Sequence, residues 1–338
     1  MNTMIIGLGR QGMRYYQALD ELGVELTCIV DINPDVAREG LPDFPADRIS
    51  DNAEKMLKKY KIDMAIISTN AAARLQIVKY CIEAGVKRIY CEKPMATNLA
   101  DADEMIRITN EAECILSINH LRRWSPNHLQ LKKLLQDGII GKIEHFYFQS
   151  GSVGLGNVGT HVIDNMRFYS ESEVDCVIGF LDQTGTPNPR GAQYKDPGGW
   201  GMMMLKDGTR AFIDTCEDTG VAHVFEIVGT YGRVVIEEMN SNWAIYARSE
   251  KDRESPLTRY TAPLEKIPMF KPIQWDVKEF TKVGLKELIF ENKTSCSGIY
   301  GLRALEAIIA FHVSHKHKGE KISLPLNKKF YSLDVPWP

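Results

Sequence analysis

Short apolar segments alternate with amphipathic segments over the first third of the chain. Five of the apolar segments predict buried strands, at residues 4–6, 25–30, 64–69, 88–91 and 115–118. Between them apolar residues recur at helical spacing, and Thr97 or Asn98 is a suitable cap for a helix over residues 99–113. Strands that alternate with helices predict a doubly wound parallel sheet, which is the Rossmann arrangement.

The pattern changes from residue 142, where longer segments alternate apolar and polar residues. These segments predict strands within residues 142–150, 174–182, 199–217, 223–238 and 243–249. Asp207-Gly208 and Tyr231-Gly232 are turn signals inside two of the segments. Consecutive strands joined by tight turns predict a sheet that is mainly antiparallel.

Two helical patterns close the chain, at residues 275–289 and 299–317. A chain of 338 residues is also long for a single core. We therefore predict an α/β protein with a Rossmann domain at residues 1–118. An α+β domain with a large, open, mainly antiparallel sheet is predicted at residues 119–338.

Composition excludes several classes of partner. The formal net charge of -3 leaves no strong basic field, so neither nucleic acid nor an anionic membrane is an expected partner. No apolar run approaches the length of a membrane span, and the start of the chain lacks the pattern of a signal peptide. The seven cysteines have no CxxC spacing, which favours buried free thiols and a cytoplasmic location over metal binding or disulfides.

A glycine cluster, GLGRQG, follows the first predicted strand and opens the first predicted helix. In the G-x-G-x-x-G pattern, Gly7 permits a tight turn, Gly9 lets the backbone approach a pyrophosphate, and Gly12 allows a helix to pack closely on a strand. The helix N-terminus then offers N–H groups to the phosphates. The pattern predicts a dinucleotide cofactor held by the whole loop, which also contains Leu8, Arg10 and Gln11.

Asp31 lies 19 residues after Gly12, at the end of the second predicted strand. A carboxylate at this place can bind both ribose hydroxyls of NAD and would repel the 2′-phosphate of NADP. NAD is therefore the predicted cofactor, with NADP less favoured, and Ile32 is expected to line the same site. Two alternatives stay open: Asp31 is a cap or turn residue, or Arg10 meets a phosphate.

Two further strands end in polar residues at the same edge of the predicted sheet. The third runs into Ser68, Thr69 and Asn70, and the fourth runs into Glu92 and Lys93. Ligands bind at the carboxyl edge of such sheets, so all five residues are expected near the cofactor. For the first three residues, the alternative is a cap on the next helix.

Lys93 is the strongest catalytic candidate in the chain. A free lysine has a pKa of about 10.4 and is a poor base at neutral pH, whereas burial or a neighbouring positive charge favours its neutral form. A neutral Lys93 would take a hydroxyl proton, and a charged Lys93 would stabilise a forming alkoxide. The alternative is a salt bridge to Glu92 or a solvated strand end.

Several motifs together resemble the Gfo/Idh/MocA family of sugar and polyol dehydrogenases. They are the glycine cluster, E-K-P at residues 92–94, QDGIIGKI at 136–143, GTHVID at 159–164 and the segment at 298–326. The resemblance covers essentially the whole chain. It implies that the second domain binds the substrate, and that Lys93 and His161 handle the proton while a hydride passes to the nicotinamide. One face of the sheet is free in such folds, so a homodimer or homotetramer through the C-terminal sheet is expected.

The residues around His161 agree with the family in part. His161 and Asp164 are spaced i, i+3 and share a helical face, so Asp164 could orient the imidazole and set its tautomer. Many family members carry an aspartate four residues before this histidine. Here Asn157 stands at that position, and an amide can hold a hydroxyl but cannot share the proton transfer. The family often has a histidine shortly after the third strand, where this chain has Arg74.

A polar cluster at the domain crossing contains the predicted substrate residues, which are Asn119, His120, Arg122, Arg123 and Trp124. Arginine suits carboxylates or phosphates and tryptophan stacks on sugar rings, so an anionic sugar or a nucleotide sugar is an expected substrate. The alternative is that the arginines hold the two domains together.

Two other functions stay open, namely a dihydrodiol or tetrapyrrole reductase on this fold and a cofactor-binding regulator without catalysis. Three histidines of the last helical pattern, at residues 312, 315 and 317, indicate a polar helix end rather than a metal site, and no metal is expected.

Overall fold

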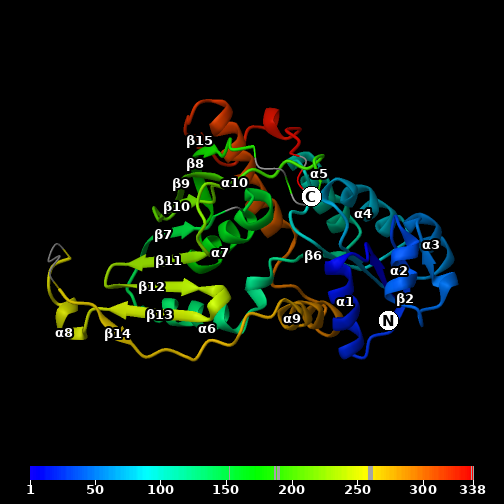
Figure 1. Ribbon diagram of the computed structural model, residues 1–338, viewed down its shortest axis with the longest axis horizontal. Helices are drawn as coiled ribbons and strands as arrows, with labels where there is room; N and C mark the ends of the chain where they lie inside the picture. The colour runs from blue at the N-terminus through cyan, green and yellow to red at the C-terminus, as the bar shows by residue number, and fades with distance from the viewer. Residues whose placement is uncertain (152, 186–187, 189–190, 258–261, 336, 338) are drawn as a thin grey trace. The chain divides into compact units, whose positions relative to one another are not determined.

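The structure is a computed structural model that describes residues 1–338 except residues 152, 186–187, 189–190, 258–261, 336 and 338 (Figure 1). Its packing divides the chain into two compact units. Unit 1 comprises Met1–Trp124, Asp276–Leu305 and Tyr331–Pro338, and unit 2 comprises Ser125–Trp275 and Glu306–Phe330. The predicted domains, residues 1–118 and 119–338, stay a prediction.

Unit 1 is built on a parallel sheet of six strands, in the order β3-β2-β1-β4-β5-β6. The strands are β1 (Thr3–Ile6), β2 (Leu26–Val30), β3 (Ile49–Ser50), β4 (Met64–Ile67), β5 (Arg88–Cys91) and β6 (Ile115–Ile118). This arrangement confirms the predicted doubly wound sheet. The sequence pattern did not predict β3, which has only two residues and is too short to show a period.

Helices connect and flank these strands. They are α1 (Arg10–Glu21), α2 (Pro34–Gly40), α3 (Ala53–Lys59), α4 (Arg74–Glu83), α5 (Leu99–Glu111) and α9 (Val277–Phe290). Asn98 caps α5 by accepting a hydrogen bond from the N–H of Asp101 at 2.8 Å, as one of the two predicted caps. Helix α9 comes from late in the chain but packs beside α1 (Figure 1), where Lys282 pairs with Glu21 at 2.5 Å.

Unit 2 contains a sheet of nine strands, in the order β14-β13-β12-β11-β7-β10-β9-β8-β15. The strands are β7 (Ile143–Gln149), β8 (Val174–Leu181), β9 (Gly199–Leu205), β10 (Arg210–Asp214), β11 (Val224–Gly229), β12 (Gly232–Glu237), β13 (Asn242–Ala247), β14 (Glu265–Ile267) and β15 (Ile322–Ser323). Strands β7 and β10 pair in parallel and the other neighbours are antiparallel, which confirms the predicted mainly antiparallel sheet.

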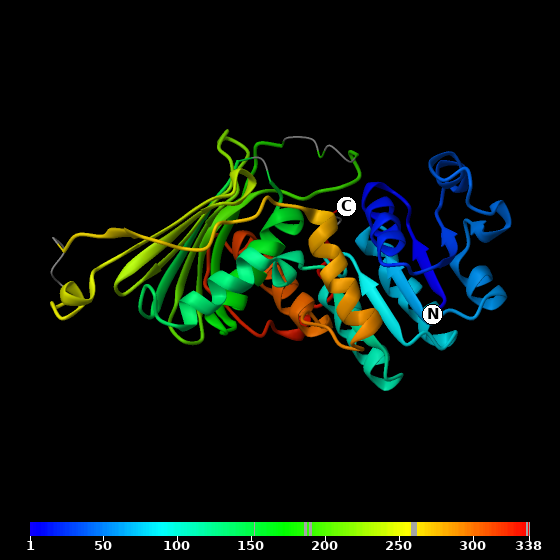
Figure 2. The same ribbon diagram turned by 90° about the horizontal axis from the view of Figure 1, so that it is seen from below.

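Helices cover one face of this sheet (Figure 2). They are α6 (Pro126–Gln136), α7 (Thr160–Ser170) and the later part of α10 (Gly298–Lys316), while α8 (Glu250–Arg253) lies near β14. The inward residues of the longer strands are buried against the helices; Phe146 and Ile227, for example, have no exposed surface. Strand residues that face the other way keep partial exposure, so the two faces differ in chemistry.

Candidate cofactor and catalytic sites

Three adjacent strands of unit 1 end at the same level of the sheet. Ile6 pairs with Ile67, and Ile67 pairs with Cys91, so the next residue of each strand lies at one edge. These next residues are Gly7, Ser68 and Glu92. The glycine loop, the polar end of β4 and the E-K-P stretch therefore meet at the carboxyl edge, as the sequence predicted.

The glycine loop makes the close approaches for which glycine is required. Gly7 has a φ of +92°, and a Cβ there would lie 2.9 Å from the carbonyl oxygen of Ser68. A Cβ on Gly12 would lie only 2.0 Å from the carbonyl oxygen of Gly7. A Cβ on Gly9 would have no neighbour within 4 Å, so the backbone at Gly9 faces open space. Such a loop fits a pyrophosphate lying against its backbone.

The N-terminus of α1 suits an anion. Its N-cap is Gly9, which makes no side-chain capping hydrogen bond, and the first turn carries no acidic residue. The exposed side chain of Arg10 adds positive charge at this helix end, and Arg14 donates a hydrogen bond to Oε1 of Gln11 at 3.0 Å. Free N–H groups and a positive helix end together favour phosphate binding.

Asp31 follows β2 and braces the glycine loop. Its Oδ2 accepts a hydrogen bond from the N–H of Leu8 at 2.6 Å, and its Oδ1 accepts one from the N–H of Asn33 at 2.9 Å. Each carboxylate oxygen has a further lone pair, so both ribose hydroxyls can still bind. Ile32 beside it is 91% exposed and offers an apolar surface at the same edge.

The polar residues after β4 bind one another and the glycine loop. The hydroxyl of Ser68 donates to the carbonyl oxygen of Gly7 at 2.5 Å. Thr69 donates to the carbonyl oxygen of Asn70 at 3.1 Å, and Asn70 caps the short helix Ala71–Ala73. Asn70 therefore makes the capping contact that was the alternative role for these residues. Cofactor contact by Ser68, Thr69 and Asn70 stays a prediction.

Arg74 gives the strand ends a brace that the sequence did not predict. Its guanidinium is buried and donates to the carbonyl oxygens of Thr69 at 2.6 Å and Glu92 at 2.7 Å, and also to that of Pro94. One side chain therefore holds the end of β4 against the segment after β5. The five donors of arginine suit such a set of carbonyls.

Glu92 lies in a buried hydrogen-bond network. Its Oε1 accepts hydrogen bonds from the hydroxyl of Tyr15 and from the amide of Asn119, the latter at 2.8 Å. Asn119 also accepts from the hydroxyl of Tyr90 at 3.0 Å. Burial raises the pKa of Tyr15 well above its ordinary value, and the charge of Glu92 raises it further. Burial also raises the pKa of Tyr90 well above its ordinary value. Both tyrosines therefore stay neutral, and Glu92 is fixed in place by the neutral donors Tyr15 and Asn119.

Lys93 follows this fixed carboxylate directly. Its backbone N–H donates to Oε2 of Glu92 at 3.2 Å, and a cis peptide bond joins it to the buried Pro94. The backbone that carries the lysine is therefore held on both sides, by Glu92 and by the contact of Pro94 with Arg74. Its side chain is partly exposed.

The predicted substrate residues after β6 are mostly buried within unit 1. Trp124 donates its indole N–H to Oε2 of Glu287 at 2.7 Å, and the guanidinium of Arg123 lies 4.0 Å from the ring centre of Tyr300. Asn119 and His120 are also buried, and only Arg122 is partly exposed. These packing contacts favour a structural role for Trp124 and Arg123, and substrate binding by the cluster stays a prediction.

In unit 2, His161 lies in the first turn of α7 and is partly exposed. Asp164, one turn later, is buried and accepts a hydrogen bond from Arg167 at 3.2 Å. Arg167 also binds Glu173 through two hydrogen bonds of 2.7 Å each. The negative charge of Asp164 is thus offset within the helix, and orientation of His161 by Asp164 stays a prediction.

Asp196 is a residue near this histidine segment that the sequence did not predict. Its carboxylate accepts hydrogen bonds from the N–H groups of Gly156 at 2.7 Å and Asn157 at 2.8 Å. It thereby holds the π-helical turn Leu155–Gly159 that leads into α7. Its position in an irregular loop, about 40 residues along the chain from Asn157, gives no local pattern that could have identified it.

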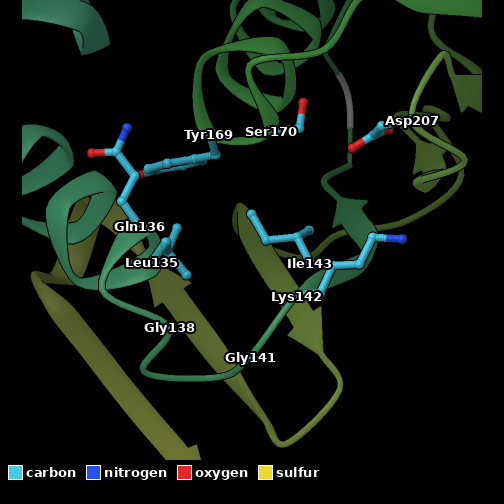
Figure 3. Close-up of a pocket in the computed structure, with 9 residues that line it drawn as sticks. All are labelled: Leu135, Gln136, Gly138, Gly141, Lys142, Ile143, Tyr169, Ser170 and Asp207. Atoms are coloured by element: carbon cyan, nitrogen blue, oxygen red, sulfur yellow. The ribbon is translucent and has the colours of Figure 1, made fainter.

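A separate pocket of about 480 Å³ lies in unit 2 (Figure 3). Its lining comes from the end of α6, the start of β7, the end of α7 and the β9–β10 turn, and includes Gln136, Lys142, Tyr169 and Asp207. No predicted site residue lines it. In the described part of the chain, no group of three or more His, Cys, Asp or Glu residues is arranged so that it could hold a metal ion.

The first 120 residues of the chain, which lie in unit 1, are similar to a known protein family. Residues 1–120 match the model of an oxidoreductase family with an NAD-binding Rossmann fold, described as GFO_IDH_MocA. This match confirms the predicted family resemblance and an NAD-binding Rossmann fold for that segment. In the described residues, no helix is long and apolar enough to cross a membrane.

Relatives extend the similarity beyond the Rossmann segment. Myo-inositol 2-dehydrogenase of Thermotoga maritima is 24% identical over 75% of this chain and 80% of its own. Levoglucosan dehydrogenase of Pseudarthrobacter phenanthrenivorans is 26% identical over 70% of this chain and 71% of its own.

Solved structures show the same fold over nearly the whole chain. A levoglucosan dehydrogenase in complex with NADH and levoglucosan has a TM-score of 0.80 and 19% identity, and the match covers 96% of this chain and 99% of the other. An oxidoreductase of Agrobacterium radiobacter in complex with NAD+, L-tartaric acid and magnesium has a TM-score of 0.76 and 17% identity, with 96% and 98% covered. The second unit therefore shares its fold with oxidoreductases of this kind.

Proposed function

We propose that the protein is an NAD-dependent dehydrogenase that moves a hydride between the nicotinamide and a secondary hydroxyl or ketone of a sugar, polyol or sugar derivative. The observation that carries this proposal is the shared edge of unit 1, where the glycine loop braced by Asp31 and the segment of Lys93 lie on either side of the end of β4. A pyrophosphate site and a positioned amine on one sheet edge are the two elements that such a reaction needs.

The residues at this edge fit NAD. The glycine loop, Gly7 to Gly12, would hold the pyrophosphate, and Asp31 with Ile32 would hold the adenosine end. Ser68, Thr69, Asn70 and Glu92 follow β4 and β5, on the other side of the glycine loop from Asp31. NAD, when bound, supplies the hydride acceptor or donor.

Lys93 and His161 are the proposed proton-handling residues. A lysine amine takes the substrate's hydroxyl proton in its neutral form and stabilises an alkoxide in its charged form. Imidazole is the side chain that most often acts as a general acid or base, so His161 is the second candidate. Asn157 would support them by hydrogen bonding to a substrate hydroxyl, because an amide neither takes nor gives a proton under these conditions.

The proposed substrate is a sugar, a polyol or a sugar derivative. The names of two relatives contain compounds of this class, myo-inositol and levoglucosan. Arg122 keeps partial exposure and would suit an anionic or nucleotide-linked substrate. A reductase of another class on the same fold is the second candidate.

Turnover with purified protein tests the proposal. We expect NADH formation from NAD with at least one member of a panel that contains inositols, levoglucosan, aldoses and sugar acids. A matched panel of aromatic dihydrodiols tests the second candidate, and turnover confined to that panel would overturn the sugar assignment.

The proposal includes a cytoplasmic location and a homodimer or homotetramer that forms through the C-terminal sheet. All seven cysteines are free thiols and six of them are buried, which suits a reducing compartment.

A further inference from the structure

Lys93 lies in the loop between β5 and α5, and its backbone is held on both sides. The carbonyl oxygens of the two flanking residues, Glu92 and Pro94, both accept hydrogen bonds from the guanidinium of Arg74, the first at 2.7 Å. Loops usually keep some freedom, because few contacts fix their backbone. Lys93 is instead the middle residue of a tripeptide that one buried side chain holds at both ends.

The same guanidinium also binds the end of β4. Its Nη2 and Nε donate to the carbonyl oxygen of Thr69, at 2.6 Å and 3.2 Å. Thr69 follows Ser68, whose hydroxyl donates to the carbonyl oxygen of Gly7 at 2.5 Å. A short series of contacts thus joins the glycine loop, which is expected to hold the pyrophosphate, to the residues on either side of Lys93.

Arginine suits this role because of its shape and its charge. Its donors point in fixed directions within one plane, so one guanidinium can bind several carbonyl oxygens at once, and the charge strengthens each bond. Arg74 is only 3% exposed, so bulk water does not reach these carbonyls in its place. Its hydrogen bonds in the described structure all go to main-chain carbonyl oxygens. Arg74 therefore fixes backbone positions.

Firm placement matters for a group that handles a proton. A displacement of about 1 Å in a catalytic group can cost about 100-fold in rate. The amide of Lys93 has a separate support, because it donates to Oε2 of Glu92 at 3.2 Å. That support holds the N-terminal side of Lys93 alone, whereas Arg74 also holds the carbonyl of Pro94 that follows it and ties the whole tripeptide to β4.

We propose that Arg74 is a positioning residue for the reaction, which holds the backbone of Lys93 in place relative to the glycine loop so that the amine meets the substrate's hydroxyl. This inference rests on the proposed role of Lys93. Arg74 acts through Lys93 and exchanges no proton itself, because a guanidinium stays charged in proteins.

A double-mutant cycle tests whether Arg74 acts through Lys93. The kcat is measured at saturating NAD with the member of the sugar panel that the wild type oxidises fastest. Arg74→Met should lower kcat by about 10- to 100-fold, while the KM for NAD changes by less than about threefold. The variant with both Arg74→Met and Lys93→Ala should be no slower than Lys93→Ala alone, because the group that Arg74 positions is already absent. Single-turnover measurements at high enzyme concentration keep the slow variants measurable.

Hydrogen exchange gives a readout that needs no turnover. In Arg74→Met the amide of Lys93 should exchange faster than in the wild type, while the amides of β1 in the same sheet keep their wild-type rates. Arg74→Lys keeps the charge but loses the planar set of donors, so its kcat should lie between those of Arg74→Met and the wild type. This milder variant also carries the cycle with Lys93→Ala if Arg74→Met fails to fold.

Arg107→Met is the matched control, because Arg107 is an exposed arginine of α5 that pairs with Glu104 at 2.7 Å. It should change neither kcat nor the exchange rate at Lys93. Wild-type kcat in Arg74→Met would overturn the proposal, and so would a double variant that is slower than Lys93→Ala by the full factor of Arg74→Met.

Failure of the proposed function gives a different result. If Lys93→Ala alone keeps the wild-type kcat, or if the wild type oxidises no member of the panel, the proposed function is wrong and this inference falls with it. If Lys93→Ala is slow and the two losses multiply, the proposed function stands and the positioning role of Arg74 is wrong.

Discussion

The backbone N–H of Leu8 donates to Oδ2 of Asp31 at 2.6 Å, which ties the glycine loop to the end of the neighbouring strand β2. The carboxylate expected to select the cofactor is therefore also a structural part of the phosphate loop. Changing Asp31 should affect both cofactor affinity and cofactor choice, and the two effects can be measured apart.

For Asp31→Ser, we expect the KM for NAD to rise by about 10- to 100-fold, because the variant loses charged hydrogen bonds to the ribose. The ratio of kcat/KM for NADP to that for NAD should also rise, because the carboxylate no longer repels the 2′-phosphate. Asp35→Ser is the control, since Asp35 is an exposed carboxylate in α2 that pairs with Arg38. An unchanged cofactor ratio in Asp31→Ser would show that Asp31 does not select NAD.

Removing one donor from the buried network around Glu92 should lower stability. Tyr15→Phe loses the hydroxyl that donates to Glu92, so the free energy of unfolding should fall by about 1–2 kcal/mol. Glu92→Ala should cost more, about 3 kcal/mol, because it leaves buried donors of Tyr15 and Asn119 without this acceptor. Denaturant unfolding measures both changes. Tyr16→Phe, on the partly exposed side of the same helix, should have a smaller effect than Tyr15→Phe.

Asp196→Ala should loosen the turn that leads into α7. The N–H groups of Gly156 and Asn157 lose their acceptor, so their hydrogen exchange should become faster. Turnover should fall by about tenfold, because a small displacement of a positioned group is costly in rate. Asp175→Ala, an exposed change in β8, is the control. Unchanged exchange at both amides would contradict the structural role of Asp196.

We expect the free energy of unfolding to fall in mild acid because of His312. Burial, with a contribution from His315, lowers the pKa of His312 to about 4, although part of its surface stays exposed. An unfolded histidine titrates near pH 6.5, so between about pH 6.5 and pH 4 the unfolded chain binds more protons than the folded one. The stability present above pH 6.5 is therefore lost as the pH falls, by about 2 kcal/mol between pH 7 and pH 5.

His312→Gln should remove most of this pH dependence in denaturant unfolding. His317→Gln is the matched control, because His317 lies on the same helix and is exposed. If both variants keep the wild-type slope of stability against pH, another group is responsible for the loss.

Local patterns predicted most of unit 1. The strand periods, the glycine cluster and the position of Asp31 depend on short segments, and the parallel register then brings Gly7 and Glu92 to one edge. Side-chain roles were harder to predict, because they depend on contacts between distant segments. Arg74, which looked like a departure from the family pattern, is a brace between two strand ends.

In unit 2, the turn residues made the hairpins predictable from the sequence. They did not predict the parallel pairing of β7 with β10. That pairing joins strands about 65 residues apart, and no turn signal connects them. Asp196 was missed for the same reason, since its partners are distant in sequence and its own loop has no period. Long-range contacts of this kind have no local signature in a single sequence.

The assignment of Lys93 as a proton-handling residue is the central claim, and steady-state turnover of Lys93→Ala at saturating NAD and substrate tests it most directly. NAD affinity, measured by calorimetry on the same sample, shows whether the cofactor edge is intact. We predict that kcat falls by about 10²- to 10⁴-fold while NAD affinity stays close to that of the wild type. Unchanged turnover in Lys93→Ala would contradict the account.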